Sequence, residues 1–355
     1  MLWPLVETLS HVEPFVPAAL VPTEALAQAR RLGARLPDAM SSYYFECRLA
    51  GNSTQVDLLT CTTAADGRQL LASQAGAAGM GESPSASLLN SIRGFCSRWA
   101  NPASALSGQI PLVWFEFDDV ARPTLDQANL GFCLEPDYLS PEWPRAAPER
   151  LDEQTFHQLV EEPLQLLLGH SVPGPLRQSL RTTFACLPEE GRIIDVSVML
   201  ARRPAVVKLY ASVPLGTLLP YLASIGWTGD ESVVLHILSS FCEPLLPQRV
   251  FIDLTLGETL SPRLGVAFPR LHLDRHQHGE QRWRQLLELC VRQGLCTPEK
   301  QAALMTWKGS SRCLYADEAW PVRMNRWADV KLVHQPGSPL EAKAYLGFTP
   351  RFSIL

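Results

Sequence analysis

The segment RIIDVSVMLARRPAVVKLYASVPLGTLLPYLASIGWTGDESVVLHILSSF, residues 192–241, contains one complete structural unit. Two runs, IIDVSVML (193–200) and AVVKLYASV (205–213), alternate apolar and polar residues with the period of a β-strand, and a short turn joins them. Two segments with helical spacing follow at 218–227 and 231–241. The segment therefore predicts an antiparallel strand pair followed by two helices.

The same order recurs along the chain. The next unit has the strand-like runs VFIDLTLG (250–257) and PRLGVAFPRL (262–271), followed by helical sequence at 282–294 and 297–307. Five strand pairs of this kind are expected, each followed by helical sequence or by the chain's end. Since ten antiparallel strands can close into a barrel, we expect an α+β fold: a ten-stranded antiparallel β-barrel inside a ring of helices, built from repeated ββαα units. The three remaining pairs are 41–51 with 55–63, 111–119 with 129–137, and 328–335 with 341–348.

A single domain with an N-terminal extension is expected. Residues 1–40 would form an N-terminal helical extension, with EALAQARRLGARL (24–36) as its best helix, and residues 41–355 a single barrel domain. The segment from Gly309 to Met324 has no clear periodicity and is expected to be an irregular link near one barrel mouth. Several tryptophans are expected at helix ends and loops in packing roles: Trp99, Trp227, Trp307, Trp320 and Trp327.

Composition argues against several functional classes. The chain has 355 residues, of which 46% are hydrophobic, and its formal net charge is −5. Nucleic acid is bound by basic surfaces, and a membrane span needs a run of about 18 apolar residues, which the sequence lacks. The N-terminus has no basic signal-peptide region, and the nine cysteines are scattered singly. We therefore expect a cytoplasmic protein with reduced thiols, no nucleic-acid partner and no membrane span.

Two segments resemble metal or phosphate sites only superficially. His272, Asp274, His276 and His278 have metal-capable side chains, but their spacing fits no familiar motif, so we expect a surface loop. The glycine-rich run GAAGMGES (76–83) lacks the following lysine and the strand–loop–helix context of a phosphate-binding loop. Neither segment is assigned a binding role.

The strand pattern predicts what lines the barrel. In AVVKLYASV, Val207 and Leu209 share one face, while Lys208 and Tyr210 share the other. Because helices pack on an apolar surface, we expect the apolar face to point outward and the polar face toward the lumen. Charges buried in a filled core are costly, so a partly solvated lumen that holds a polar or charged ligand is expected. An open sheet with helices on one face and solvent on the other predicts the same alternation and is the alternative.

The order of elements is that of the ABBA prenyltransferases, and the sequence resembles that family at specific places. A Lys-x-Tyr motif occurs at 208–210 and again at 343–345. FECRL (45–49) and VPLGTLLPYLASIGWTGDE (213–231) resemble the cyanobactin-type branch, which modifies peptides. The resemblance implies transfer of an isoprenyl group from an allylic diphosphate, dimethylallyl or geranyl, to a peptide side chain or an aromatic acceptor in ribosomal-peptide natural product biosynthesis. It implies no tightly bound cofactor.

The same resemblance assigns roles to inward-facing residues. Positive side chains would stabilise charge on the leaving oxygen, aromatic faces would protect the allyl cation, and an acid would accept a proton from the acceptor. By resemblance to the corresponding strand of the cyanobactin-type enzymes, Glu46 is the catalytic acid–base residue, with Glu116 as its substitute. The diphosphate would be held by Lys208, Arg263, Lys331 and Lys343, and the cation would be shielded by Tyr210, Tyr345 and Trp114.

The sequence departs from the family's pattern on two strands. QVDLLTC (55–61) offers Asp57 where the family has a basic residue, and NLGFCLEP (129–136) offers no basic residue. Asp195 and Asp253 are also expected to face inward, and a magnesium ion that bridges them is the one metal site left open. These departures favour one alternative, a barrel that lost the diphosphate clamp and acts as a binding protein. A second alternative is an accessory protein that recognises the leader of a precursor peptide.

Overall fold

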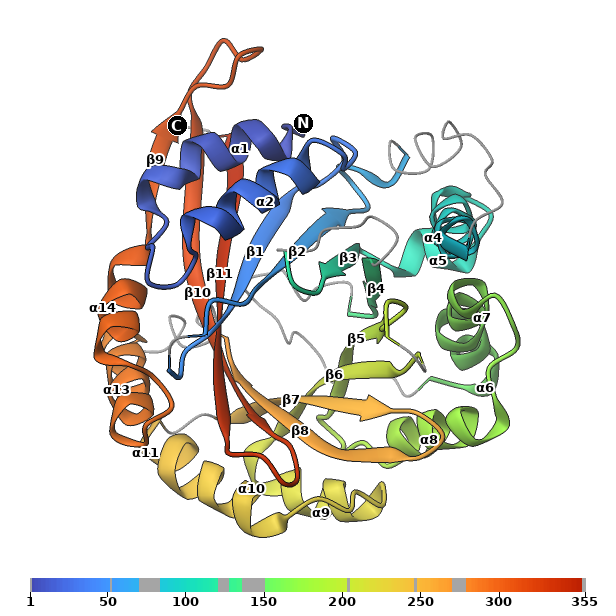
Figure 1. The fold of residues 1–355 in the computed structure, drawn as a ribbon. Coiled ribbons are helices and arrows are strands. Elements are labelled where there is room, and N and C mark those ends of the chain that lie inside the picture. Colours follow the sequence, from blue (N-terminus) through green and yellow to red (C-terminus); the bar gives the residue numbers. More distant parts are fainter. Residues whose placement is uncertain are drawn as a thin grey trace.

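Eleven strands form one antiparallel sheet, and ten of them close into a barrel with helices around it (Figure 1). Closure occurs because β11 (Glu341–Phe352) pairs with β1 (Ser42–Arg48) on one side and with β10 (Val322–His334) on the other. The predicted closed barrel is therefore confirmed, and the open-sheet alternative is wrong. The computed structural model describes residues 2–51, 53–69, 84–120, 128–135, 151–202, 205–245, 248–269 and 279–352.

Two segments discussed above, 76–83 and 272–278, lie outside these described ranges. Their expected loop structure therefore stays a prediction. Around the barrel, the strands follow one another in chain order from β1 to β8, and β10 and β11 then complete the ring. The further strands are β2 (Val56–Thr63), β3 (Leu112–Phe117), β4 (Ala128–Cys133), β5 (Arg192–Val198), β6 (Val207–Pro214), β7 (Arg249–Leu256), β8 (Leu260–Phe268) and β9 (Gly309–Cys313).

The expected irregular link from Gly309 to Met324 was wrong. Residues 309–313 form β9, which pairs with the first half of β10, and β10 begins at Val322. The second half of β10 pairs with β8, so one long strand belongs both to the barrel wall and to a hairpin that projects from it (Figure 1). The sequence GSSRC of β9 is polar, so no hydrophobic alternation marks it as a strand.

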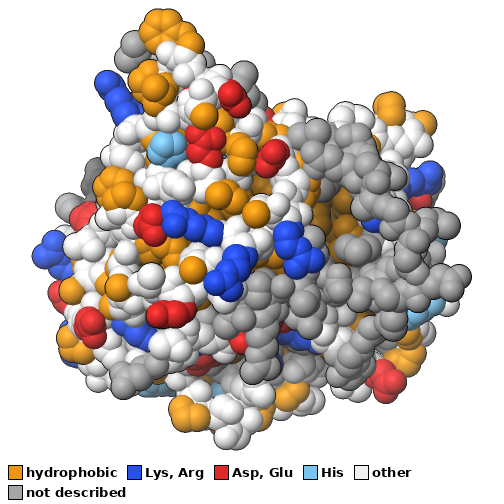
Figure 2. All heavy atoms as spheres, turned by 45° about the horizontal axis from the view of Figure 1, so that its top comes forward, with side chains coloured by type: hydrophobic (Ala, Val, Ile, Leu, Met, Phe, Trp, Pro, Cys, Tyr) orange, Lys and Arg blue, Asp and Glu red, His pale blue; other side chains and the backbone are white. Residues whose placement is uncertain are grey.

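Apolar side chains are exposed on this projecting hairpin, which reaches the top of the view in Figure 2. Leu314 is 58% exposed and Trp320 is 75% exposed, so the packing role expected for Trp320 was wrong. Both acidic and basic side chains are present on the described part of the face drawn in Figure 2. In the described ranges, no helix combines the length and the apolar composition needed to cross a membrane.

Helices surround the barrel wall (Figure 1). The expected N-terminal helical extension contains α1 (Leu5–Val12) and α2 (Thr23–Gly33), and Leu9 and Leu32 are buried in the same core as the barrel strands. The N-terminal helices therefore pack on the barrel. The other helices of the described ranges are α4 (Pro84–Ala100), α5 (Ala105–Gln109), α6 (Glu153–Phe156), α7 (Glu162–Leu168), α8 (Gly174–Ala185), α9 (Leu218–Ser224), α10 (Glu231–Ile237), α11 (Glu243–Leu245), α13 (Gly279–Arg292) and α14 (Pro298–Trp307), with short 3₁₀ turns at η1 (Glu13–Phe15) and η4 (Leu215–Thr217).

Capping and proline signals set several helix boundaries. At the start of α14, the Thr297 side chain accepts a hydrogen bond from the backbone N–H of Lys300. α7 and α11 each begin with Glu-Pro, and a π-helical turn stands directly before each of them, η3 (His157–Glu161) and η5 (Leu238–Cys242). Proline has no N–H and crowds the carbonyls of the preceding turn, which accounts for the widened turns.

The main hydrophobic core lies between the barrel wall and the helices. Val207 and Leu209 on β6 are fully buried in it, and Trp283 of α13 and Trp307 of α14 are fully buried in the same core. Lys208, between the two apolar residues of β6, faces the lumen instead. The predicted alternation, apolar outward and polar inward, is therefore confirmed on this strand. Burial of each large apolar side chain contributes roughly 1.5–3 kcal/mol to stability.

Candidate functional site

Charged side chains line one end of the lumen, called here the hairpin end because the turns within the strand pairs lie there, such as residues 335–340 between β10 and β11. A cavity of about 480 Å³ lies at this end. Among the described residues, six basic and four acidic side chains line it. These are Arg48, Arg202, Lys208, Arg263, Lys331 and Lys343, with Glu46, Asp57, Glu116 and Glu341.

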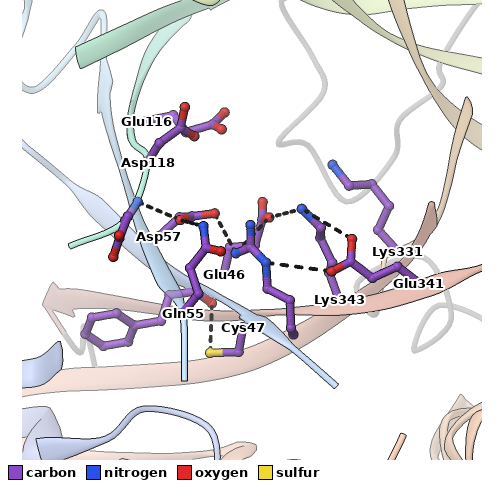
Figure 3. A network of polar contacts seen from close by, with 12 residues as sticks. Glu46, Cys47, Gln55, Asp57, Glu116, Asp118, Lys331, Glu341 and Lys343 are labelled. Carbon is purple, nitrogen blue, oxygen red and sulfur yellow. Dashed lines mark hydrogen bonds and ion pairs between the residues drawn. The ribbon is translucent and has the colours of Figure 1, made fainter. Parts of the chain in front are cut away.

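Lys343 and Glu46 connect the last and the first strand of the barrel. Lys343 Nζ donates a hydrogen bond of 2.8 Å to Glu46 Oε1 and lies 3.9 Å from Glu341 Oε2 (Figure 3). Burial alone would raise the pKa of Glu46, which is 5% exposed, but Lys343, Lys331 and Arg48 together hold this pKa well below its usual value. Glu46 is therefore ionised and a weak base in this state.

Arg48 brings positive charge to the part of the cavity where β2 carries an acid. Its Nη1 atom lies 2.6 Å from Asp57 Oδ2 and 3.5 Å from Glu46 Oε1. Asp57 also accepts a hydrogen bond of 2.7 Å from the backbone N–H of Asp119 (Figure 3). Burial and the nearby Glu46 raise the pKa of Asp57 in spite of Arg48. A cation from β1 thus occupies the region where β2 lacks a basic residue.

Asp253 on β7 holds two of the cations. Lys331 Nζ donates a hydrogen bond of 3.0 Å to Asp253 Oδ2, and Arg263 Nη1 lies 3.7 Å from the same oxygen. Burial raises the pKa of Asp253, but Lys331, Lys208 and Arg263 lower it far below its usual value. A Cβ at Gly265 would lie 2.9 Å from Asp253 Cβ and 3.2 Å from Lys331 Cδ, so the close approach of this pair to β8 requires glycine.

Glu116 on β3 faces the remaining cations. Lys208 Nζ lies 3.8 Å and Arg202 Nη2 3.5 Å from Glu116 Oε1, and Arg202 also pairs with Asp118 at 3.0 Å. Because Arg202 lies in the turn between β5 and β6, it brings a cation to the side of the mouth where β4 has none. Burial raises the pKa of Glu116 and lowers that of Lys208. The charge states of both groups therefore respond readily to a charged ligand.

Aromatic side chains face the lumen below the charged layer. Tyr44 packs edge-on against Trp114 at 5.5 Å and against Trp327 at 5.3 Å between ring centres. Lys331 Nζ lies 5.0 Å from the centre of the Tyr345 ring, so one ring face is already presented to a cation. Trp327 lies within β10, one residue before the expected strand start at residue 328, and the prediction that placed it in a loop or at a helix end was wrong.

An apolar cluster lies in the lumen on the side away from the hairpin end. A small buried cluster there is separate from the main core, and Trp114 and Tyr210 pack against it. Tyr210 stacks on Phe251 with 5.9 Å between ring centres. The expectation that the whole inward face is polar was therefore wrong at this end, and the lumen changes from charged to aromatic to apolar along its axis. The cluster consists of Cys61, Leu112, Cys133, Ile194 and Phe251.

Asp195 lies between the aromatic layer and the apolar end, opposite Cys133 and Tyr210 in the strand register. Burial raises the pKa of Asp195 to about 7. Asp253 flanks Tyr210 from the other side and is already bonded to Lys331. No group of three or more metal-capable His, Cys, Asp or Glu side chains occurs within the described ranges. A magnesium ion that bridges the two aspartates stays a prediction.

Several buried polar atoms on lumen-facing strand positions have no hydrogen-bond partner among the described residues. Buried polar groups in folded proteins are nearly always paired, so a group of unpaired ones in a cavity points to bound water or a ligand. They are both donors and acceptors and occur from the charged layer down to the apolar end. The atoms are Trp114 Nε1, Asp195 Oδ1, Thr255 Oγ1 and Tyr345 Oη.

The structure brings the residues selected from the sequence into one lumen. Glu46, Glu116, Lys208, Arg263, Lys331 and Lys343 line the cavity. Tyr210, Tyr345, Trp114, Asp195 and Asp253 share the inward strand faces with them.

Sequence reasoning assigned no functional role to Arg202 and Tyr44, and only a packing role to Trp327. Tyr44 could have been found, since it precedes Glu46 by two positions and so shares its strand face. Arg202 lies in a turn, where no periodicity predicts the direction of a side chain. Neither the protein-family models nor the curated proteins with which the chain was compared include a match to it.

Proposed function

We propose that the protein is a prenyltransferase that moves an isoprenyl group from an allylic diphosphate, dimethylallyl or geranyl, to a peptide side chain or an aromatic acceptor. One observation carries this proposal: a closed barrel whose lumen has six basic side chains at the hairpin end, aromatic rings below them and an apolar far end. An allylic diphosphate has the same order of chemistry, a multivalent anionic head and an apolar tail.

The donor would bind with its diphosphate among Lys208, Arg263, Lys331 and Lys343. These side chains stabilise negative charge, and they do so most strongly as the allylic C–O bond breaks and its electron pair moves to the diphosphate oxygen. Arg263, Lys331 and Lys208 come from three different strands, and all three lie near Asp253. Cations gathered from several strands would contact both phosphates of the donor at once. Bond cleavage leaves diphosphate as the leaving group and an allyl cation below it.

The aromatic layer would protect the allyl cation from water. Tyr345 presents its ring face to Lys331 Nζ in the donor-free lumen, which supports the same ring facing a ligand cation. Trp114 and Tyr44 pack edge-on against each other and make the wall of the lumen aromatic over this layer. The acceptor's nucleophilic atom then forms the new bond to the allylic carbon.

Glu46 would take the proton that the acceptor loses. Its carboxylate lies at the junction of β1 and β11 beside Lys343, so an acceptor that enters through the hairpin end meets it next to the donor. Glu116 faces the same cavity from β3 and is the nearest substitute. With this function, and with the sequence resemblance described above, the protein would be a member of the ABBA family, nearest in character to its peptide-modifying branch in ribosomal-peptide biosynthesis.

Incubation with dimethylallyl and geranyl diphosphate and a panel of tyrosine-, tryptophan- and arginine-containing peptides, followed by mass spectrometry, tests the proposal. We expect one acceptor to gain the mass of one isoprenyl group, and Glu46→Gln to abolish the gain. Absence of any product with every donor, together with absence of diphosphate binding, would overturn the proposal.

The alternative is a barrel that binds a ligand without transferring a group. It is favoured by the observation that the cavity lysines are already paired with carboxylates, Lys343 with Glu46 and Lys331 with Asp253. A non-reactive thiolodiphosphate analogue of the donor separates the two functions. A binding protein would bind the analogue and release the true donor unchanged.

A further inference from the structure

Carboxylates occupy the positions around the lysines that the proposed function gives to phosphate oxygens. Glu46 Oε1 accepts from Lys343 at 2.8 Å, and Asp253 Oδ2 accepts from Lys331 at 3.0 Å. The side chains of both lysines are 12–13% exposed, and those of both acids are 6–7% exposed. A diphosphate cannot reach these cations without competing with the acids that hold them.

Of these two acids, Glu46 is the proposed proton acceptor, so losing its lysine partner would change its role in the reaction. The positive groups that face it are Lys343 of β11, Lys331 of β10 and Arg48 of β1. The negative or acidic groups around it are Asp57 of β2, Glu116 of β3 and Glu341 of β11, and the Tyr345 hydroxyl also faces it. These cations keep Glu46 ionised. An anion that pairs with them in place of Glu46 therefore makes Glu46 easier to protonate.

We propose that donor binding switches Glu46 from an ion-pair partner to a proton acceptor, because the diphosphate takes over Lys343 and leaves the carboxylate without its main cation. The inference rests on the proposed function and adds the binding order: the donor binds first, and only then is Glu46 able to accept the acceptor's proton. Lys343 is accordingly a positioning residue for the base as well as a diphosphate ligand.

The proton balance of donor binding tests this coupling. Raising the proton affinity of Glu46 makes the complex take up a proton in the pH range between its donor-free and donor-bound titrations. Calorimetric titration with dimethylallyl thiolodiphosphate, in two buffers of different ionisation enthalpy, measures that uptake at pH 5.5. The ligand's own titration is common to all variants and cancels in their comparison.

We expect wild type to take up more protons per analogue bound than Glu46→Gln does. The matched control is Glu135→Gln, because Glu135 is also a partly buried carboxylate paired with a cation, Arg192 at 2.9 Å, but belongs to the opposite end of β4 and β5. Its proton uptake should equal that of wild type. Lys343→Met should bind the analogue more weakly and show a reduced uptake, with thermal melting used to confirm that it folds.

The outcomes separate the coupling from the proposed function. Analogue binding with the same proton uptake in wild type and Glu46→Gln overturns the coupling and leaves the diphosphate site standing. No analogue binding by wild type at any pH overturns both. A difference that appears equally in Glu135→Gln also overturns the coupling, since it would then arise from general changes in charge.

Discussion

Lys343 Nζ donates a 2.8 Å hydrogen bond to Glu46 Oε1 across the junction of β11 and β1, where the barrel closes. The two residues lie 297 positions apart in the chain, so the pair exists only when the first and last strands meet. The proposed base and one of the proposed diphosphate ligands are therefore assembled by closure itself.

Glu46→Gln should lower the rate of transfer by about 10²–10⁴-fold, because an amide cannot accept the acceptor's proton. Donor affinity should not fall, since the substitution removes a competitor for Lys343. Single-turnover kinetics with saturating donor measure the two effects separately. A rate within a few-fold of wild type would show that Glu46 is not the base, and Glu116→Gln is then the variant to measure.

Lys331→Met should weaken donor-analogue binding by about 10- to 100-fold, the range expected for loss of one hydrogen bond to a charged group. Lys308→Met is the matched control. Lys308 directly follows α14, its side chain is 40% exposed, and it pairs with Glu280 on the surface. Calorimetry should give wild-type affinity for the control. Equal affinity in all three proteins would contradict a diphosphate site at the hairpin end.

Tyr345→Leu should increase the fraction of donor that is hydrolysed to an allylic alcohol, because water reaches the cation where the ring is removed. The transfer rate should fall by about 2- to 30-fold, corresponding to the loss of one cation–π contact. Tyr345→Phe keeps the ring and should behave like wild type. Chromatography of the allylic alcohol and the product gives the ratio, and an unchanged ratio in the leucine variant would speak against shielding by Tyr345.

Asp195→Asn should stabilise the protein at pH 8 and have little effect at pH 4. The pKa of Asp195 is about 7 in the folded protein and about 3.9 in an unfolded chain, so the folded state favours the protonated acid. That contribution is complete below about pH 4 and is lost as pH rises through 7, whereas the amide keeps it at every pH. Denaturant unfolding at the two pH values should show a gain of up to about 4 kcal/mol at pH 8 only. An equal effect at both would contradict a buried, proton-binding Asp195.

The alternation within strands was enough to predict the barrel and most of the site. Lys208 and Tyr210 differ from Val207 and Leu209 by one position, and the period of two sends each pair to opposite faces. Arg263 and Lys343 were found in the same way. A strand's face is a local property, so it can be inferred without knowing the strand's neighbours.

What the sequence could not predict depends on contacts between distant segments. β9 is polar and becomes a strand only because β10 extends beyond β8 and offers it a partner. Arg202 is in a turn, and its approach to Glu116 and Asp118 follows from the side-by-side placement of turns at the hairpin end. The apolar end of the lumen was also missed, because polar and apolar residues share the inward face of a single strand, as Asp253 and Phe251 do on β7.

A crystal structure of the complex with dimethylallyl thiolodiphosphate would test the central claim most directly. The account predicts both phosphates among Lys208, Arg263, Lys331 and Lys343, with the allyl group beside Tyr345 and directed toward the apolar cluster. Phosphates bound outside the lumen, or at the opposite end of the barrel near Arg192 and Arg249, would contradict it.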